Sequence, residues 1–416
     1  MSSHYSNLSR RSVIFATPMI MGAAGDSIFG AVRTNVGPTV NVFDFMAPDQ
    51  IGQVQARTRR ADVTRAVQAA IDSRPAALFF PPGDYPVSPD SRLRYALIVR
   101  NLSMEMYGDG ATIAMASIGN FQALRIENCF DTSLRGLRFA GSGTNGTNGG
   151  QGLVQVFGGS NFTAENCAFD EANCDGIAIA EVAGVTLSGC SSRQASKAAL
   201  YVNNSYNVRV LGNTATSFGG HLAGAHVVGV GLQLSGNADV LAQNNTVSQG
   251  VGVGILCDNS GPRLPKGNRL IRNNVINVSN PQYPEVSGGI RLTNDQPSKD
   301  CDTIVAENTV RGCGFYNFYV ENQDQAVIQG NVGIESYRSN FVFSRVSGIT
   351  VSNNIAINTD TSGGRGQYAY YLINDARSVN GVGNKAVTMA GYAAASGANA
   401  VADVTGNKNA IALIGN

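Results

Sequence analysis

The sequence predicts an all-β fold, a right-handed parallel β-helix with coils of about 23 residues and an N-terminal capping helix. Three observations predict it. A turn recurs at a fixed period, the segments between turns alternate apolar and polar residues at every second position, and an amphipathic helical segment precedes the repeats. Self-similarity of this kind indicates a solenoid in which each unit packs on its neighbours.

The repeat is most visible between Phe162 and Asn407, where each unit contains a turn residue followed by Asn or Cys. Five of the nine steps between successive markers are 23 residues long, and the others are longer. The preceding residue is Gly or Asn at nine of the ten markers, and these residues accept a left-handed backbone. Asn at one phase predicts an internal ladder of side-chain amide hydrogen bonds. The markers are Cys167, Cys190, Asn213, Asn245, Asn274, Asn308, Asn331, Asn354, Asn384 and Asn407.

The segments between the turns are predicted to be strands, because their apolar residues alternate with a period of two and not of 3.6. Three short strands and three corners fill a 23-residue unit, and successive coils stack about 4.8 Å apart, as in a parallel sheet. The clearest alternating runs are 176–180, 185–187, 231–235 and 289–293, and residues 124–126 and 153–156 align with them.

Residues 1–31 are predicted to be an export segment, followed by one domain over residues 32–416. Ser9 to Phe15 contains an Arg pair that resembles a twin-arginine motif, and an apolar run from Val13 to Ala24 follows it. This run is too short to span a membrane as a helix, and no other segment is long enough. The segment therefore predicts a periplasmic or extracellular protein.

A helix is predicted over about residues 62–73, with Asp62 or Thr64 at its N-terminus and an apolar face of Val67, Ala70 and Ile71. It would cover the open end of the solenoid, which would otherwise be an exposed sheet edge. Phe79 and Phe80 would begin the first coil, and the Pro-Pro-Gly that follows would make its first corner.

Residues 41–46 (NVFDFM), 62–72 (DVTRAVQAAID) and 77–85 (ALFFPPGDY) together resemble the opening of pectate-lyase-superfamily β-helix proteins, including phage tailspikes and polysaccharide-degrading enzymes. The resemblance implies the fold and a polysaccharide partner, and it leaves a homotrimer open. It does not choose an activity, since hydrolases, lyases, epimerases and adhesins share this opening. The paired-Asp and Gly-His-Gly signatures of polygalacturonases and the Asp-Pro-His motif of alginate epimerases are absent from the sequence.

The composition excludes several other classes of function. The formal net charge is +1 and charged residues make up 14% of the chain, so the basic face of a nucleic-acid-binding protein is not expected. The seven cysteines form no metal-binding pattern and are expected as buried thiols stacked inside the solenoid. We expect no cofactor. Asp170, Glu171 and Asp175 could hold Ca²⁺, but their spacing matches no calcium motif and favours a polar turn.

The extra residues of the longer units fall at only two of the three corners, before and after the strand that we call the first strand. Loops on both sides of one face predict a groove on that face, and binding groups are usually placed on such loops. The insertions before the first strand are 141–150, 217–226, 280–287 and 360–367, and those after it are 258–268 and 295–301.

The side chains predicted to point outward from the first strand form two columns. The first column contains Ala178, Tyr201, Gln233, Leu256, Arg291, Tyr319, Val342 and Leu372. The second contains Ala180, Asn203, Ser235, Asp258, Thr293, Glu321, Ser344 and Asn374. This mixture of polar, charged and aromatic residues is typical of a sugar-binding groove.

Asp258 and Glu321 are the predicted catalytic pair, two coils apart in one column and so roughly 9.6 Å apart at the backbone from the strand spacing. A carboxyl separation of about 6.5–9.5 Å suits inverting glycoside hydrolysis. Arg291, on the coil between them, could bind a uronate carboxylate or hold one acid ionised. The alternative is that these charged residues have no catalytic role and only keep the sheet face soluble, with weak cross-strand ion pairs. Substrate binding is assigned to Tyr201, Gln233, His226, Tyr319, Asp295 and Lys266.

The favoured function is therefore polysaccharide hydrolysis on the first-strand face. The second hypothesis is β-elimination on a uronate polymer, with Arg291 neutralising the carboxylate and His226 or Tyr319 as the base. The third is a non-catalytic glycan-binding or surface protein.

Overall fold

The computed structural model describes residues 37–413, apart from 91, 118, 120, 144–151, 221–228, 259–266, 281–286, 299–301, 358–367, 388–400 and 408, and apart from the side chains of 295–298 and 402. The expected export segment and the domain boundary after residue 31 lie outside these residues and stay predictions.

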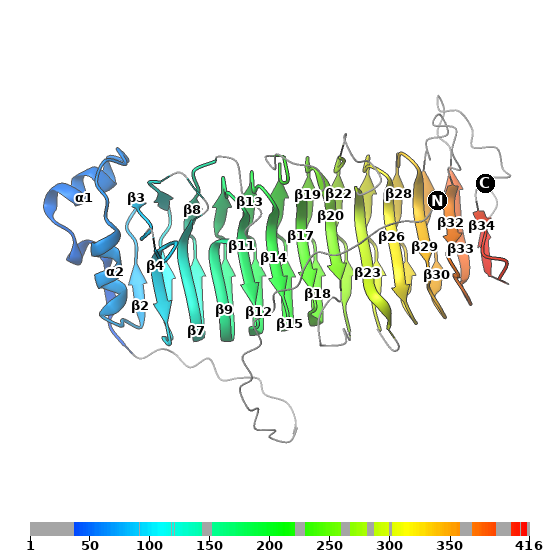
Figure 1. The fold of residues 1–416 in the computed structure, drawn as a ribbon, viewed down its shortest axis with the longest axis horizontal. Helices are drawn as coiled ribbons and strands as arrows, with labels where there is room; N and C mark the ends of the chain where they lie inside the picture. The colour runs from blue at the N-terminus through cyan, green and yellow to red at the C-terminus, as the bar shows by residue number, and fades with distance from the viewer. Residues whose placement is uncertain are drawn as a thin grey trace, which may run out of the picture. The chain divides into compact units, whose positions relative to one another are not determined.

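Each coil consists of three short parallel strands, and equivalent strands of successive coils form three ladders, as expected (Figure 1). The first-strand ladder contains β4 (Tyr95–Arg100), β7 (Gln122–Arg135), β9 (Gly152–Glu165), β11 (Asp175–Ala180), β14 (Ala198–Asn203), β17 (Gly229–Ser235), β20 (Gly252–Asp258), β23 (Gly288–Ser298), β26 (Tyr316–Gln323), β29 (Ser339–Ser344), β32 (Tyr368–Ile373) and β34 (Val401–Asp403).

The second ladder contains β1 (Thr39–Asn41), β2 (Ala77–Phe79), β5 (Glu105–Tyr107), the later parts of β7 and β9, β12 (Ala183–Ser188), β15 (Tyr206–Leu211), β18 (Ala238–Gln243), β21 (Arg269–Ile271), β24 (Ile304–Ala306), β27 (Val327–Gln329), β30 (Thr350–Ser352), β33 (Asn380–Val387) and β35 (Ala410–Leu413). The third contains β3 (Gly83–Val87), β6 (Ala111–Met115), β8 (Arg138–Ala140), β10 (Ala168–Asp170), β13 (Ser191–Arg193), β16 (Thr214–Thr216), β19 (Thr246–Ser248), β22 (Asn274–Ile276), β25 (Thr309–Arg311), β28 (Val332–Ile334) and β31 (Ile355–Ile357), and it ends in β33.

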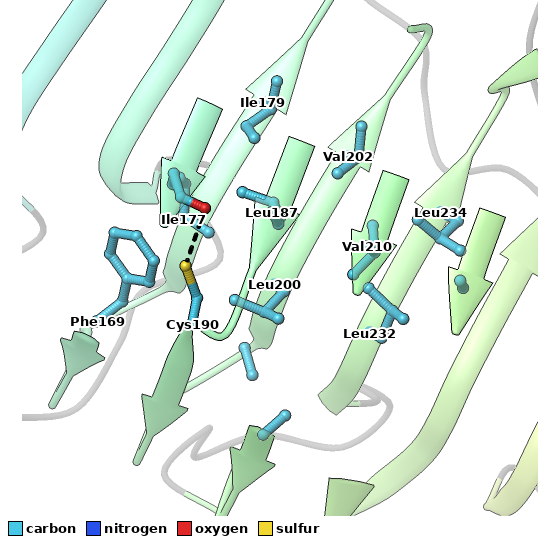
Figure 2. Close-up of a cluster of buried hydrophobic side chains, with 14 of the residues drawn as sticks. Phe169, Ile177, Ile179, Leu187, Cys190, Leu200, Val202, Val210, Leu232 and Leu234 are labelled. Carbon is cyan, nitrogen blue, oxygen red and sulfur yellow. Dashed lines mark hydrogen bonds between the residues drawn. The ribbon is translucent and has the colours of Figure 1, made fainter. Parts of the chain in front are cut away.

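Apolar side chains from all three ladders fill the interior of the coils. Figure 2 shows Ile177 and Ile179 of β11 pointing inward with Leu187 of β12 and Phe169 of β10, and all four are fully buried. The next coil repeats the arrangement with Leu200, Val202 and Val210. Repetition of the same packing along the axis makes one continuous core, which fixes which strand residues must face outward.

A ladder of buried Asn side chains holds the corner between the second and third ladders. The Asn245 side-chain oxygen accepts hydrogen bonds from the backbone and the side-chain amide of Asn213, at 2.9 and 3.0 Å. The same pair of bonds recurs to Asn384. The predicted ladder is therefore confirmed with two corrections. Asn273 and not Asn274 occupies it, and Asn407 lies between β34 and β35, at the corner between the first and second ladders, where its side chain donates to the Ala376 carbonyl. Asn274 lies in β22 and is exposed.

The N-terminal end is capped by three short helical segments: a 3₁₀ helix, η1 (Val42–Phe45), α1 (Pro48–Gln55) and α2 (Thr64–Asp72). Helix α2 confirms the predicted helix, and its buried face is Val67, Ala70 and Ile71 as expected. The Asp62 carboxylate accepts from the backbone N–H of Thr64 at 2.8 Å, so it fixes the start of α2. Helix α1 was not expected from the sequence, because its apolar positions are few.

Six of the seven cysteines, all but Cys301, belong to the described part of the chain, and these six are buried free thiols, as expected. The Cys190 thiol donates to the Ala164 carbonyl at 3.3 Å, so it occupies the core as a small apolar group with a weak donor (Figure 2). No helix within the described ranges is long and apolar enough to cross a membrane.

Candidate functional site

Register places the expected columns on one surface, which we call the first-strand face: the outward-facing side chains of the first-strand ladder. Tyr201, Gln233, Leu256, Arg291 and Tyr319 are successive register partners in the first column. At β32 the expectation was wrong by one residue. Val342 is paired with Tyr371 and Ser344 with Ile373, while Leu372 is buried in the core.

Asp258 and Glu321 lie in the second column with Thr293 between them, as predicted. Asp258 is the partner of Thr293, and Thr293 is the partner of Glu321. Asp258 is half-buried, whereas Glu321 is 8% exposed. The two carboxylates therefore lie on the same face and in the same column, but Glu321 is more deeply buried than Asp258.

Four side chains surround the Glu321 carboxylate. Arg345 Nη2 lies 2.5 Å from Oε1, and the Tyr319 hydroxyl donates to the same oxygen at 3.0 Å. The Thr293 hydroxyl donates to Oε2 at 3.1 Å, and Arg291 Nη2 lies 3.6 Å from it. Each carboxylate oxygen therefore has one hydroxyl donor and one arginine beside it, and these contacts fix the orientation of the side chain.

The side chains of Arg291 and Tyr319 are stacked on each other, so each limits the movement of the other. The Arg291 guanidinium lies over the Tyr319 ring at 5.4 Å, and the Tyr316 ring packs on Tyr319 at 4.7 Å. Burial, and then the charge of Glu321, raise the pKa of Tyr319 to about 12. Burial alone would lower the pKa of Arg291, but Tyr316, Glu321 and Tyr319 outweigh it and hold that pKa above its usual value. Near neutral pH the arginine is charged and the phenol is protonated.

Asp258 belongs to a second polar group on the preceding coils. The Ser235 hydroxyl donates to Asp258 Oδ2 at 2.9 Å, and the Gln233 side-chain amide donates to Ser235 at 3.1 Å. Tyr201 lies on the coil before Gln233, and its pKa is raised to about 12 by burial and then by Asp175 and Asp258. Lys197 Nζ lies 5.9 Å from the centre of the Tyr201 ring.

The side chains of the other three predicted substrate-binding residues lie outside the part of the chain that the structure describes. Asp295 belongs to β23, but its side chain lies outside the described part, as do His226 and Lys266 entirely. Most residues of the predicted groove walls are likewise outside the described ranges, so the groove stays a prediction. Asp170 contacts Arg138 at 2.9 Å, and Asp175 is fully buried, with Oδ1 accepting from the Ala198 N–H.

Sequence reasoning missed Arg345 and Tyr316. Arg345 follows the outward column and has a left-handed backbone, with φ of 50°, which turns its side chain back towards Glu321. Its Nε also donates to the Asn322 side chain at 2.9 Å. Alternation alone cannot find a residue at a corner. Tyr316 precedes the alternating run, and its ring fills the space beside Gly288, where a Cβ would lie 2.2 Å from the ring.

A family model for a right-handed β-helix region matches residues 122–299 of the chain. The Dettilon tailspike protein is similar in structure, with a TM-score of 0.57 and 14% identity over 87% of this chain and 68% of that one. The catalytic domain of a GH87 α-1,3-glucanase in complex with nigerose has a TM-score of 0.56 and 13% identity over 84% and 67%.

The Streptococcus pneumoniae surface protein and adhesin PfbA has a TM-score of 0.51 and 15% identity, over 85% of this chain and 96% of that one. A comparison with curated proteins gives no match. At these identities the three structures establish the fold, and the resemblance seen in residues 41–85 is confirmed at that level. The chain is a right-handed parallel β-helix protein.

Proposed function

We propose that the protein binds a polysaccharide along the first-strand face and hydrolyses it between Asp258 and Glu321. The observation that carries this proposal is the register, which aligns the two carboxylates in one outward column with Thr293 between them. Two coils separate their backbones by roughly 9.6 Å, and movable side chains bring such a pair into the range of inverting glycosidases.

The surroundings of the two carboxylates suggest their roles. An inverting enzyme needs one ionised carboxylate to activate water and one carboxylic acid to protonate the leaving oxygen. We assign Glu321, which has two arginines beside it, as the base. We assign Asp258, which accepts from the Ser235 hydroxyl, as the acid. Tyr319 and Arg291 would contact the sugar.

The similar structures agree with a glycan partner. One is named as a tailspike, one as an α-1,3-glucanase bound to nigerose, and one as a surface adhesin. These names support a polysaccharide partner and a site of action outside the cytoplasm. They do not choose the polymer, and the twin-arginine route and a homotrimer remain part of the proposal.

The test is turnover by the Glu321→Gln variant, measured as new reducing ends from neutral and uronate polysaccharides. We expect turnover to fall at least about a hundredfold while glycan binding is kept, because the amide cannot accept a proton. Asp258→Asn should behave in the same way. The control is Glu307→Gln at the Asn-ladder corner, where an exposed glutamate pairs with Arg272. Unchanged turnover by the Glu321 variant would show that the assignment is wrong.

A lyase with Tyr319 as the base is disfavoured, because a phenol with a pKa raised to about 12 holds its proton at neutral pH. A non-catalytic binding protein is the second candidate, and the four side chains around Glu321 favour it because they occupy both carboxylate oxygens, one of which a general base must offer to water. Products separate the three. Hydrolysis leaves reducing ends alone, elimination also leaves ultraviolet-absorbing unsaturated ends, and a binding protein leaves neither.

A further inference from the structure

A second cluster of charged residues lies on the N-terminal part of the first-strand face. Arg100 and Arg125 both contact Glu127, with Arg100 Nη2 at 2.6 Å from Oε2 and Arg125 Nε at 2.5 Å from Oε1. The Arg125 guanidinium also lies 5.8 Å from the centre of the Tyr95 ring. As around Glu321, a glutamate bridges two arginines, one of which lies over a tyrosine. The cluster has one positive charge in excess.

An exposed aromatic ring follows this cluster on the next coil. Phe157 is 40% exposed and is the register partner of Glu127, so it lies in the second column. Gln155, the partner of Arg125, lies beside it in the first column. An apolar ring next to planar hydrogen-bonding groups can pack on the apolar face of a sugar ring while its neighbours bind hydroxyl or carboxylate oxygens.

These residues lie on the same two columns as the candidate site. Register leads from Phe157 through Ala180, Asn203 and Ser235 to Asp258, in four steps. Four coils correspond to about 19 Å along the axis, and the seven coils from Glu127 to Glu321 to about 34 Å. The face is therefore continuous between the two clusters.

We propose that Arg125, Gln155 and Phe157 form a distal binding site for the same polysaccharide chain that reaches Asp258. The inference rests on the proposed function and specifies its substrate as a long chain, because a short oligosaccharide bound at Asp258 cannot span about 19 Å to Phe157. Phe157 contacts a sugar ring, and Arg125 with Gln155 contacts its hydroxyl or carboxylate oxygens.

The experiment compares Phe157→Ala and Arg125→Gln with the unchanged protein in affinity electrophoresis through gels containing soluble α-glucan, polygalacturonate or alginate. Size-fractionated fragments of whichever polymer binds are then titrated by calorimetry. The control is Phe130→Ala, because Phe130 is 55% exposed but lies where β7 enters the second ladder, off the first-strand face.

We expect Phe157→Ala to weaken binding of long chains about fivefold while leaving short fragments unaffected, because stacking on an aromatic ring contributes about 1 kcal/mol. The control should bind like the unchanged protein. If the unchanged protein binds a polymer and Phe157→Ala and Arg125→Gln bind its long chains equally well, the distal site is wrong and the proposed function stands. If the unchanged protein binds none of the polymers, both are wrong for these polymers.

Discussion

At the scale of single residues, the surroundings of the Tyr319 hydroxyl keep it protonated. The phenol is half-buried and donates to Glu321, so losing its proton would place two negative charges together in a partly dry environment. Its raised pKa is the consequence. The hydrogen bond therefore keeps one direction, from tyrosine to glutamate, across the whole physiological pH range.

This fixed state predicts an alkaline effect on stability. An unfolded tyrosine ionises near pH 10, whereas the pKa of Tyr319 in the folded protein is raised to about 12. Between these values the unfolded chain loses the proton first, so the free energy of unfolding falls as pH rises from 10 towards 12. Tyr319→Phe should reduce that fall, and at pH 8 it should cost about 1 kcal/mol for the lost hydrogen bond.

Urea unfolding at pH 8, 10 and 11 measures both effects. Tyr206→Phe is the control, because Tyr206 is 44% exposed on the second ladder. An identical pH dependence in the Tyr319 variant and the unchanged protein would contradict the prediction.

At the scale of elements, the sequence predicted the strands and most of the marked corners, but the markers Asn274 and Asn407 do not lie in the ladder. Residues 273 and 274 are both Asn, and the coils on either side contain insertions, so spacing could not choose between them. The structure chooses Asn273, because Arg272 before it takes the left-handed turn with φ of 56°. The two residues have identical side chains and differ only in their direction: Asn273 is buried in the ladder, whereas Asn274 is exposed.

The neighbouring pair offers a matched test of the Asn ladder. Asn273 accepts from Asn245 and donates to the Ala242 carbonyl and to Asn308, all in the core. Asn273→Ala would leave buried partners without hydrogen bonds, and we expect it to cost about 3 kcal/mol in the free energy of unfolding. Asn274→Ala, at an exposed position, should change stability by less than about 0.5 kcal/mol. Equal costs in chemical denaturation would contradict the ladder assignment.

At the scale of the whole molecule, the core, the cap and the columns could be predicted because each follows from a local period. The predicted columns are wrong at β32, where Tyr371 and Ile373 take the predicted places of Leu372 and Asn374. The long 360–367 insertion precedes this strand, so the spacing from the previous coil does not fix which of its residues face outward. The contacts of Arg345 with Glu321 and Asn322 could not be predicted, because they depend on a corner conformation and not on alternation. The roles of Asp258, Glu321 and Arg291 stay predictions.

The cap gives a prediction for the molecule as a whole. Ala70 is fully buried where α2 packs against the first coils, whereas Ala69 is exposed on the same helix. Ala70→Asp should cost about 3 kcal/mol or more, because it buries a charge without a partner, and it should expose the end of the solenoid. We expect concentration-dependent association in analytical ultracentrifugation.

Ala69→Asp is the matched control and should stay as stable and as dispersed as the unchanged protein. A monomeric, fully stable Ala70 variant would show that α2 is not needed to close the coil end.

The Asn ladder also has a consequence for how such a chain can diversify. Asn245 and Asn273 each bond the coil before and the coil after, so one added residue at that corner would break two sets of hydrogen bonds and turn the next strand inside out. The corners beside the first strand already differ in length from coil to coil. Changes in length are therefore tolerated mainly beside the first-strand face, where we propose that the polysaccharide binds, and new specificities can arise there without altering the scaffold.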